Sequence, residues 1–321
     1  MTSSQPTSAT LAFVFPGQGS QSVGMLADLA AIHPQIRETF AEASEGAGMD
    51  LWALAQDGPE AELNRTECTQ PALLAAGVAV WRAWIARGGV LPSIVAGHSL
   101  GEYSALVAAG ALSLHDGAKL VRERGRLMQE VVPAGAGAMA AVIGADDLLV
   151  EQVCAEVSTG GDAIVVPANF NSPGQIVIGG DAIAVDTALA MLAGRGVRKV
   201  VRLAVSVPSH TPLMREAAQR LGEIMARMQW NAPRVAVVQN VDAIARTDAL
   251  AIQNALVEQL YLPVRWTQCV EKLATHGATR ILECGPGKVL TGLTKRIDRE
   301  LDARAIGAPA DFDVALKDFN A

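Results

Sequence analysis

The sequence predicts an α/β protein in which helices cover a parallel sheet and a second, smaller unit is inserted. Half of the 321 residues are hydrophobic and 18% are charged, a composition that favours a folded core over a disordered chain. Aromatic residues make up only 4%, so the core must consist mostly of Ala, Val, Leu and Ile. Alanine-rich helices over valine-rich strands are typical of an α/β fold.

The first part of the chain alternates short apolar runs with longer helical patterns. Residues 11–15 (LAFVF) are rich in β-forming residues and end at a Pro-Gly pair, which predicts a buried strand that leads into a loop. Residues 93–97 (SIVAG) predict a second buried strand. Helical patterns cover 22–45, 59–87, 103–111 and 116–132. Strands that alternate with helices in this way predict a parallel sheet.

The middle of the chain has a different order of elements. Strands are predicted over 138–143, 164–166, 175–178 and 199–205, helices over 146–157 and 182–193, and a turn over 171–174. The order β-α-β-β-α-β is that of a ferredoxin-like unit. We therefore expect an inserted ferredoxin-like subdomain over 134–205, within a large domain formed by 11–133 and 206–310.

The remainder of the chain is predicted to return to the large domain. Helices are expected over 212–228, 249–260 and 264–276, and strands over 235–240 and 280–283. The segment 1–10 lacks the basic start and apolar stretch of a signal peptide, so we expect a loose tail there.

Charge and cysteine content argue against several classes of protein. The net charge of −7 argues against a dedicated nucleic-acid binder, because such proteins need a clustered positive surface. The four cysteines have no CxxC spacing and no histidine completes a zinc pattern, which predicts free thiols, no metal site and a reducing, cytoplasmic location. The longest uncharged stretch, 163–180, contains two prolines and is not expected to span a membrane.

A candidate nucleophile lies in residues 97–101 (GHSLG), which match G-x-S-x-G. The motif follows a predicted strand and precedes a predicted helix, the context in which it indicates a nucleophile. A sharp turn there would project Ser99 at a helix N-terminus, where free N–H groups and the helix dipole favour an oxyanion. The alternative is a tight turn with a capping serine.

A serine nucleophile requires a base, and five histidines are available. His210 lies in a loop stiffened by two prolines (VPSHTP), between a predicted strand and a predicted helix, where active-site groups are common. His33, His115 and His276 have ordinary structural explanations, and His98 should point away from its neighbour. No aspartate occupies the strand-end position of a third triad member, which favours a Ser–His dyad whose imidazole is oriented by a backbone carbonyl or an amide.

The residues alone do not decide which of three arginines turns inward or whether the Gln18 loop binds a ligand. Arg122, Arg124 and Arg126 alternate along one predicted helix and cannot share a face. One of them could reach inward, where it would need a carboxylate partner. Gln18 lies in a Gly-Gln-Gly loop after the first strand, whose backbone N–H groups could approach a ligand, although an ordinary strand–helix loop is the alternative.

Seven short motifs occur in order along the chain. They are FPGQGSQ (15–21), TQPA (69–72), GHSLGEYSAL (97–106), RG (124–125), NFNSPGQ (169–175), PSH (208–210) and ECGPGKVL (283–290). Together they resemble the malonyl-CoA:acyl carrier protein transacylases of bacterial type II fatty acid synthesis, over about residues 11–296. The ordered set is far more specific than any one motif.

The resemblance implies an α/β-hydrolase-like large domain with an inserted ferredoxin-like subdomain, in agreement with the pattern above. It also implies a set of site residues, each with one role: the nucleophile Ser99, the base His210, the malonyl-carboxylate partner Arg124, the backbone oxyanion donors Gln18 and Leu100, and Gln259, whose carbonyl orients the histidine.

The implied reaction is ping-pong transfer of malonyl from malonyl-CoA to the phosphopantetheine thiol of acyl carrier protein, with no bound cofactor. Acetyl-CoA should be a poor substrate. Because the carrier is usually acidic, we expect a basic rim to the cleft, with the candidates Arg198, Lys199, Lys288 and Lys295. No self-complementary apolar face is evident in the sequence, which favours a monomer.

Three alternatives stay open. A related acyltransferase could serve a polyketide synthase in trans or a malonate decarboxylase with the same chemistry. A serine hydrolase shares G-x-S-x-G, although Arg124, the missing triad aspartate and the inserted subdomain speak against it. A catalytically silent scaffold could bind carrier protein alone, although the intact site residues speak against that. The strictness for malonyl over methylmalonyl is also open.

Overall fold

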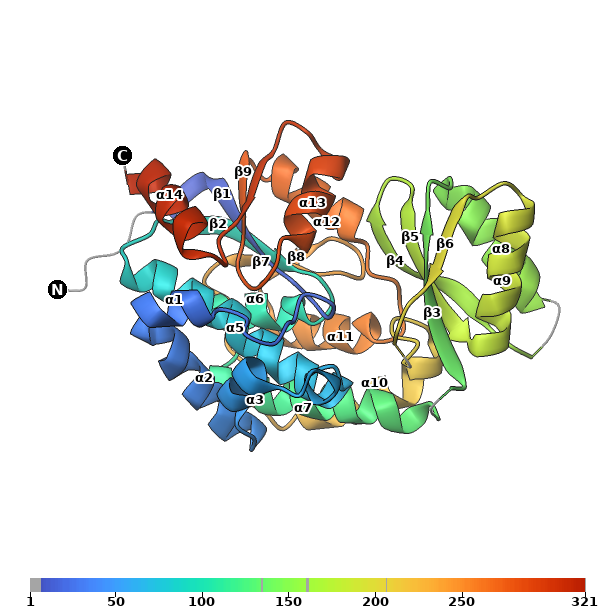
Figure 1. Ribbon diagram of the computed structural model, residues 1–321, viewed down its shortest axis with the longest axis horizontal. Coiled ribbons are helices and arrows are strands. Elements are labelled where there is room, and N and C mark those ends of the chain that lie inside the picture. The colour runs from blue at the N-terminus through green and yellow to red at the C-terminus, as the bar shows by residue number, and fades with distance from the viewer. Residues whose placement is uncertain (1–6, 134, 160–161, 206, 321) are drawn as a thin grey trace.

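Two separate sheets organise the protein (Figure 1). The computed structural model describes residues 7–133, 135–159, 162–205 and 207–320. The strands of the larger sheet are β1 (Thr7–Phe15), β2 (Leu91–Gly97), β7 (Ala236–Val238), β8 (Ala245–Arg246), β9 (Arg280–Glu283) and β10 (Asp302–Ala305). Their order is β10-β9-β1-β2-β7-β8, and neighbours are parallel except β7 and β8. The predicted sheet with parallel strands is confirmed.

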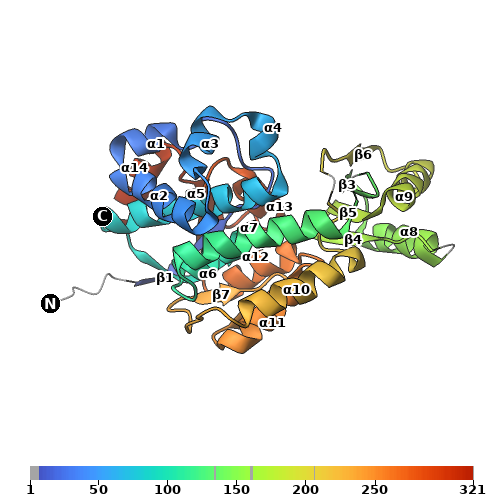
Figure 2. The same ribbon diagram turned by 90° about the horizontal axis from the view of Figure 1, so that it is seen from below.

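Helices cover both faces of the larger sheet. Alternate side chains of β1 enter opposite cores, with Phe13 on one side and Val14 on the other. The helices on the Phe13 side include α2 (Pro34–Ala47), α5 (Thr66–Ala86), α6 (Gly101–Ala108), α7 (Leu114–Val131) and α10 (Arg215–Met225). The helices on the Val14 side are α12 (Trp266–Thr275) and α13 (Val289–Ile297). Figure 2 shows α7 alongside α10.

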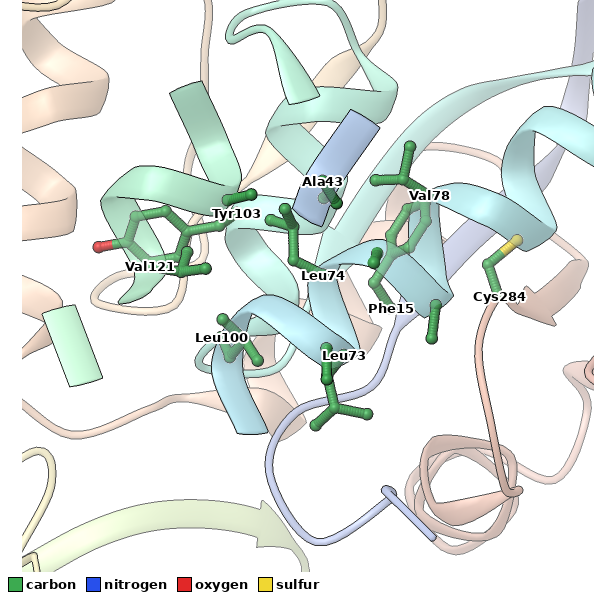
Figure 3. Packing of buried hydrophobic residues seen from close by; sticks show 14 of the residues in the cluster. Phe15, Ala43, Leu73, Leu74, Val78, Leu100, Tyr103, Val121 and Cys284 are labelled. Atoms are coloured by element: carbon green, nitrogen blue, oxygen red, sulfur yellow. The ribbon is translucent and has the colours of Figure 1, made fainter. Parts of the chain in front are cut away.

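Helix α5 lies at the centre of the larger core. Sixteen of its 21 residues are buried, as expected for a helix that is apolar on most sides. Figure 3 shows Leu73, Leu74 and Val78 of this helix beside Phe15 of β1. This packing supports the carboxyl end of β1, where the Gly-Gln-Gly loop begins.

The smaller sheet belongs to the middle of the chain. Its strands are β3 (Gly137–Ile143), β4 (Val165–Ser172), β5 (Gln175–Asp181) and β6 (Lys199–Arg202), in the order β4-β5-β3-β6 with antiparallel neighbours. Helices α8 (Asp147–Thr159) and α9 (Ala182–Gly194) pack on one face. The order of these elements and the antiparallel sheet match the ferredoxin-like expectation. Residues 134 and 206, at the expected boundaries, lie outside the described residues, so the division into 11–133, 134–205 and 206–310 stays a prediction.

Strand β4 joins the smaller sheet to the large domain through backbone bonds to Val264, just before α12. The Phe170 N–H donates to the Val264 carbonyl at 2.9 Å, and the Val264 N–H donates to the Ala168 carbonyl at 2.9 Å. Both bonds join backbone atoms, so they hold the smaller sheet against the segment that precedes α12.

Several predicted boundaries were wrong. The segment 22–45 contains two helices, α1 (Ala27–Ile32) and α2, because His33 is extended before Pro34. Strand β4 continues past its predicted end at 166, which leaves a shorter turn, and β6 ends before 205. The segment 212–228 begins with a 3₁₀ turn and its helix ends at Met225.

Other elements were not predicted at all. They are α3 (Leu51–Asp57), β8, β10 and α14 (Pro309–Asn320). Helices α4 (Glu60–Leu63) and α5 divide the predicted segment 59–87, while α11 (Ala249–Gln259) lies where a helix was expected. The predicted tail was too long, because residues 7–10 belong to β1, and residues 1–6 lie outside the described residues. Among the described residues, no helix has both the length and the apolar character to cross a membrane.

Candidate active site

Ser99 lies in a tight turn between β2 and α6. Its φ is 51°, in the left-handed region that residues other than glycine rarely adopt. A Cβ at Gly97 would lie 1.9 Å from the Gly101 backbone, and a Cβ at Gly101 would lie 2.0 Å from the Phe15 carbonyl. The turn is held by Asn240, whose Oδ1 accepts from the Ser99 N–H at 2.7 Å while its Nδ2 donates to the Gly97 carbonyl at 2.7 Å. Strain at a fixed position of this kind is typical of functional sites.

His210 faces the serine across the cleft between the sheets. Its Nε2 lies 2.7 Å from Ser99 Oγ, and its Nδ1 lies 2.6 Å from the Gln259 carbonyl oxygen. Because a carbonyl can only accept, Nδ1 carries the proton and Nε2 is free to accept from the serine. Burial and the Arg124 cation lower the pKa of His210 to about 3. The imidazole is therefore neutral at pH 7, as a general base must be.

Arg124, on α7, lies beside both reacting groups. Its side chain is 1% exposed. Nη1 donates to Gln70 Oε1 at 2.9 Å, and Nη2 donates to Gln259 Oε1 at 3.0 Å. Nη2 also lies 3.4 Å from Ser99 Oγ. The guanidinium is thus held by two amide oxygens and directed at the nucleophile.

Arg124 has no carboxylate partner within ion-pair distance among the described residues. An inward arginine was expected to need such a partner, and the described part of the protein does not supply one. Glu102 acts on it only electrostatically, and burial lowers the pKa of the guanidinium. A buried cation that lacks a counter-charge is costly, so the site favours an anionic ligand.

The neighbouring arginines of α7 turn outward. Arg126 forms ion pairs with Glu123 at 2.9 Å and Glu130 at 2.7 Å. Arg122 donates to a backbone carbonyl at the end of α2. The structure therefore selects one arginine of the three, a choice that the residues alone left open.

A cavity of about 260 Å³ lies between the two sheets. Ser99, His210 and Arg124 line it, together with Gln18 and Leu100. Apolar side chains from the smaller unit cover the opposite side, among them Met139, Val177 and Leu203. A mostly apolar pocket with a few converging polar groups is the usual form of a ligand site.

The loop that carries Gln18 lies directly against the nucleophile turn. A Cβ at Gly17 would lie 2.5 Å from the His98 carbonyl oxygen, and the His98 N–H donates to the Phe15 carbonyl at 3.0 Å. Glycine therefore allows an approach that no larger residue could make. The backbones of Gln18 and Leu100 are thus both brought to the edge of the cavity that contains Ser99.

His98 has a separate role in the structure. Its Nε2 lies 2.7 Å from Asn171 Oδ1 on β4, and its ring lies 5.4 Å from that of Trp266. These contacts turn it away from Ser99, as expected. The candidate docking residues Arg198, Lys199, Lys288 and Lys295 are all exposed. Within the described residues, no group of three or more His, Cys, Asp or Glu side chains could hold a metal ion.

Four further polar residues support the site and were not predicted as site residues from the sequence. Each was already inside a quoted motif or a predicted strand: Gln70, Glu102, Asn171 and Asn240. Gln70 and Glu102 are buried polar residues within helices whose other buried residues are mostly apolar, and Asn240 closes the strand predicted over 235–240. A buried polar side chain needs a partner, and that need is the signal that could have identified them.

The fold and this arrangement define an acyltransferase: the acyl transferase domain family matches residues 12–305, and the chain belongs to it. Within that class it is similar to malonyl CoA-acyl carrier protein transacylases. It is 55% identical over 305 residues to that of Salmonella typhimurium, covering 95% of this chain and 98% of the relative. It is 43% identical over 307 residues to that of Bacillus subtilis, covering 96% of each.

Solved structures agree with this assignment. The malonyl-CoA:acyl carrier protein transacylase of Xanthomonas oryzae pv. oryzae has a TM-score of 0.96 and 70% identity, covering 98% of this chain and 99% of that one. A malonyl-transacylase solved in complex with its type II PKS acyl-carrier protein has a TM-score of 0.94 and 52% identity, covering 96% and 99%.

Proposed function

We propose that the chain transfers a malonyl group from malonyl-CoA to the phosphopantetheine thiol of acyl carrier protein, and so supplies malonyl-acyl carrier protein for fatty acid synthesis. The observation that carries this proposal is Arg124, a buried cation without a carboxylate partner whose Nη2 lies 3.4 Å from Ser99 Oγ. A malonyl group has a free carboxylate close to its thioester carbonyl. It can therefore pair with the arginine and present the carbonyl to the serine.

The first half-reaction acylates the serine. His210 Nε2 takes the hydroxyl proton as Ser99 Oγ attacks the thioester carbonyl. The oxyanion forms beside the Gln18 and Leu100 N–H groups, then collapses as the carbon–sulfur bond breaks. The leaving coenzyme A thiolate takes the proton from His210, which leaves a malonyl ester on Ser99 and a neutral imidazole.

The second half-reaction reverses these roles. His210 removes the proton from the carrier's phosphopantetheine thiol, and the sulfur attacks the malonyl-serine carbonyl. The carbon–oxygen bond breaks, and Ser99 recovers the proton from His210. No bound cofactor takes part in either half. Acetyl-CoA should be a poor substrate, because it would leave Arg124 buried and unpaired.

Further parts of the proposal concern the setting of the reaction. The acidic carrier docks on a basic rim that includes Arg198, Lys199, Lys288 and Lys295, whose exposure supports this role. The protein acts as a cytoplasmic monomer. A role with a polyketide carrier uses the same chemistry, and transfer rates to the two kinds of carrier would separate them.

The test is intact-protein mass spectrometry after brief incubation with malonyl-CoA. We expect a malonyl adduct on the parent and none on Ser99→Ala. Adding carrier protein with its phosphopantetheine arm should remove the adduct and malonylate the carrier, whereas carrier without the arm should do neither. Release of free malonate in place of transfer would support a hydrolase, and no adduct at all would support a silent scaffold.

A further inference from the structure

Glu102 is a fully buried carboxylate that the mechanism above does not use. It lies in the first turn of α6, three residues after Ser99. Its Oε2 accepts from the Asn240 N–H at 2.9 Å and from Gln259 Nε2 at 3.0 Å, and its Oε1 accepts from Gln239 Nε2 at 3.3 Å. Among the described residues, no Lys or Arg lies within ion-pair distance of it. Burying a carboxylate that is bonded only to amides costs folding free energy, so a specific structural task is expected for it.

The two amides at Oε2 lead directly to the reacting groups. Asn240 donates its backbone N–H to Glu102 and accepts from the Ser99 N–H through Oδ1 at 2.7 Å. Gln259 donates Nε2 to Glu102, accepts from Arg124 through Oε1 at 3.0 Å, and accepts from His210 through its backbone carbonyl. Ser99, Arg124 and His210 are therefore each linked to Glu102 by hydrogen bonds through a single intervening residue.

The orientation of the Gln259 amide is the critical point. Nε2 has two acceptors, the Ser99 carbonyl at 2.9 Å and Glu102 Oε2 at 3.0 Å. The reversed amide would place its oxygen against both of these and its NH₂ group against the Arg124 guanidinium. An acceptor at position 102 therefore directs the Gln259 oxygen toward the arginine.

We propose that Glu102 is a positioning residue, which fixes the Gln259 amide so that Arg124 is held to bind the substrate carboxylate, and which supports the Ser99 turn through Asn240. The inference rests on the proposed function. Burial raises the pKa of Glu102 to about 7, while the hydrogen bonds from Asn240 and Gln259 oppose that shift. Oε2 remains an acceptor when a proton resides on Oε1, so the task does not require the negative charge.

The experiment compares Glu102→Gln and Glu102→Asp. The glutamine retains the length and an acceptor, whereas the aspartate retains the charge but is one methylene too short to reach Gln259. The matched control is Glu283→Asp, which shortens an equally buried carboxylate that bonds only the first turn of α13. Circular dichroism and thermal unfolding establish that each variant is folded.

The measured quantity is the ratio of kcat/KM for malonyl-CoA to that for acetyl-CoA, obtained from rates of Ser99 acylation. Glu102→Asp should lower this ratio about tenfold, because even a displacement of about 1 Å of a substrate-positioning group can cost on the order of a hundredfold in rate. Glu102→Gln should keep the ratio within about threefold of the parent, because it retains the acceptor that orients the Gln259 amide. Glu283→Asp should leave it unchanged.

Two outcomes with a parent that forms the malonyl adduct overturn the proposal. An aspartate variant that slows both acylations equally would show a merely structural role for Glu102. A glutamine variant that loses more than about threefold in the ratio would show that the charge is required, and this result stands even if the aspartate variant does not fold. Failure of the parent to form a malonyl adduct would instead contradict the proposed function, so the two failures are distinguishable.

Discussion

The two sides of helix α7 use the same residue type in opposite ways. Arg126, on the outer side, has a 44% exposed side chain and pairs with Glu123 and Glu130. Arg124, on the inner side, is 1% exposed and contacts only uncharged groups. Exposed pairs of the first kind typically contribute about 0–1 kcal/mol. The second kind costs stability in the free protein and is expected where a ligand supplies the missing charge.

The same contrast between paired outer charges and unpaired inner charges is found elsewhere in the protein. Outer charged residues such as Arg304 pair with nearby carboxylates, Asp302 and Asp318. The buried Arg124 and Glu102 are instead separated by the Gln259 amide, which bonds both. An amide between opposite charges holds them in place without neutralising either. The inner arginine is therefore arranged for an anionic ligand, whereas the outer arginines Arg126 and Arg304 have carboxylate partners within the protein.

The largest expected effect comes from removing the inner arginine. Arg124→Ala should lower kcat/KM for malonyl-CoA by about 3 kcal/mol, roughly 150-fold, because the substrate carboxylate would be buried without a partner. Acylation by acetyl-CoA should not fall, because the variant has no guanidinium that acetyl would leave unpaired. The measurement is the rate of adduct formation with each substrate by intact mass.

The outer arginine provides the matched control. Arg126→Ala removes the same charge two residues away and should change neither kcat/KM value, with unfolding free energy within about 1 kcal/mol of the parent. A similar loss in both variants would show that the charge of α7 as a whole attracts the substrate, and the contrast between the two sides would fail.

A smaller effect is expected from giving the inner arginine a carboxylate. Gln259→Glu retains the backbone carbonyl that His210 contacts but replaces the amide oxygen at Arg124 with an acid. Malonyl-CoA kcat/KM should fall about tenfold or more, since the new carboxylate competes with the substrate for the arginine and repels it. Its second oxygen also replaces the donor Nε2 and faces the Ser99 carbonyl and Glu102 Oε2, which adds to the loss. Initial rates over a range of malonyl-CoA concentrations should show the loss mainly in KM. An unchanged KM would contradict the view that Arg124 is free to pair with the carboxylate of the substrate.

The smallest expected effect is that of pH on the acylation rate, which should hardly change. The pKa of His210 is lowered to about 3, so the base stays neutral and the acylation rate should vary less than about twofold between pH 7 and 5. Stability should respond, because the unfolded chain protonates this histidine below about pH 6.5 whereas the folded one does not. This histidine therefore lowers the unfolding free energy as pH falls from about 6.5 toward 3, whereas the raised pKa of Glu102 contributes in the opposite direction between about 7 and 4.5. The loss assigned to His210 is therefore the decrease in unfolding free energy below about pH 4.5, where both states of Glu102 are protonated.

Single-turnover acylation and urea unfolding at each pH test these two statements. The buffers must keep ionic strength constant, so that screening of the outer ion pairs does not change with pH. A tenfold fall in the acylation rate with a midpoint near 6.5 would contradict a lowered pKa at His210.

Much of the fold followed from local pattern. The apolar runs at 11–15 and 93–97 were long enough to indicate buried strands, and the change of order in the middle of the chain indicated a second sheet. Length alone does not explain why β8 and β10 were missed, because β7 and β9 are no longer than β10 and were predicted. Strand β8 has only two residues, too few to show a period, and β10 (DARA) carries two charged residues instead of an apolar run. Helix α14 was missed although Phe312 is fully buried in the main core.

The sequence by itself determined the strand–turn–helix around Ser99, because the flanking glycines and the short apolar run are local features. Only the tertiary structure decided which arginine turns inward, and that the Gln259 amide lies between it and Glu102. Gln259 and Ser99 are 160 residues apart, and Asn240 and Ser99 are 141 apart. Contacts at such separations leave no local pattern, since they depend on how helices and sheets pack, and packing is a property of the whole chain.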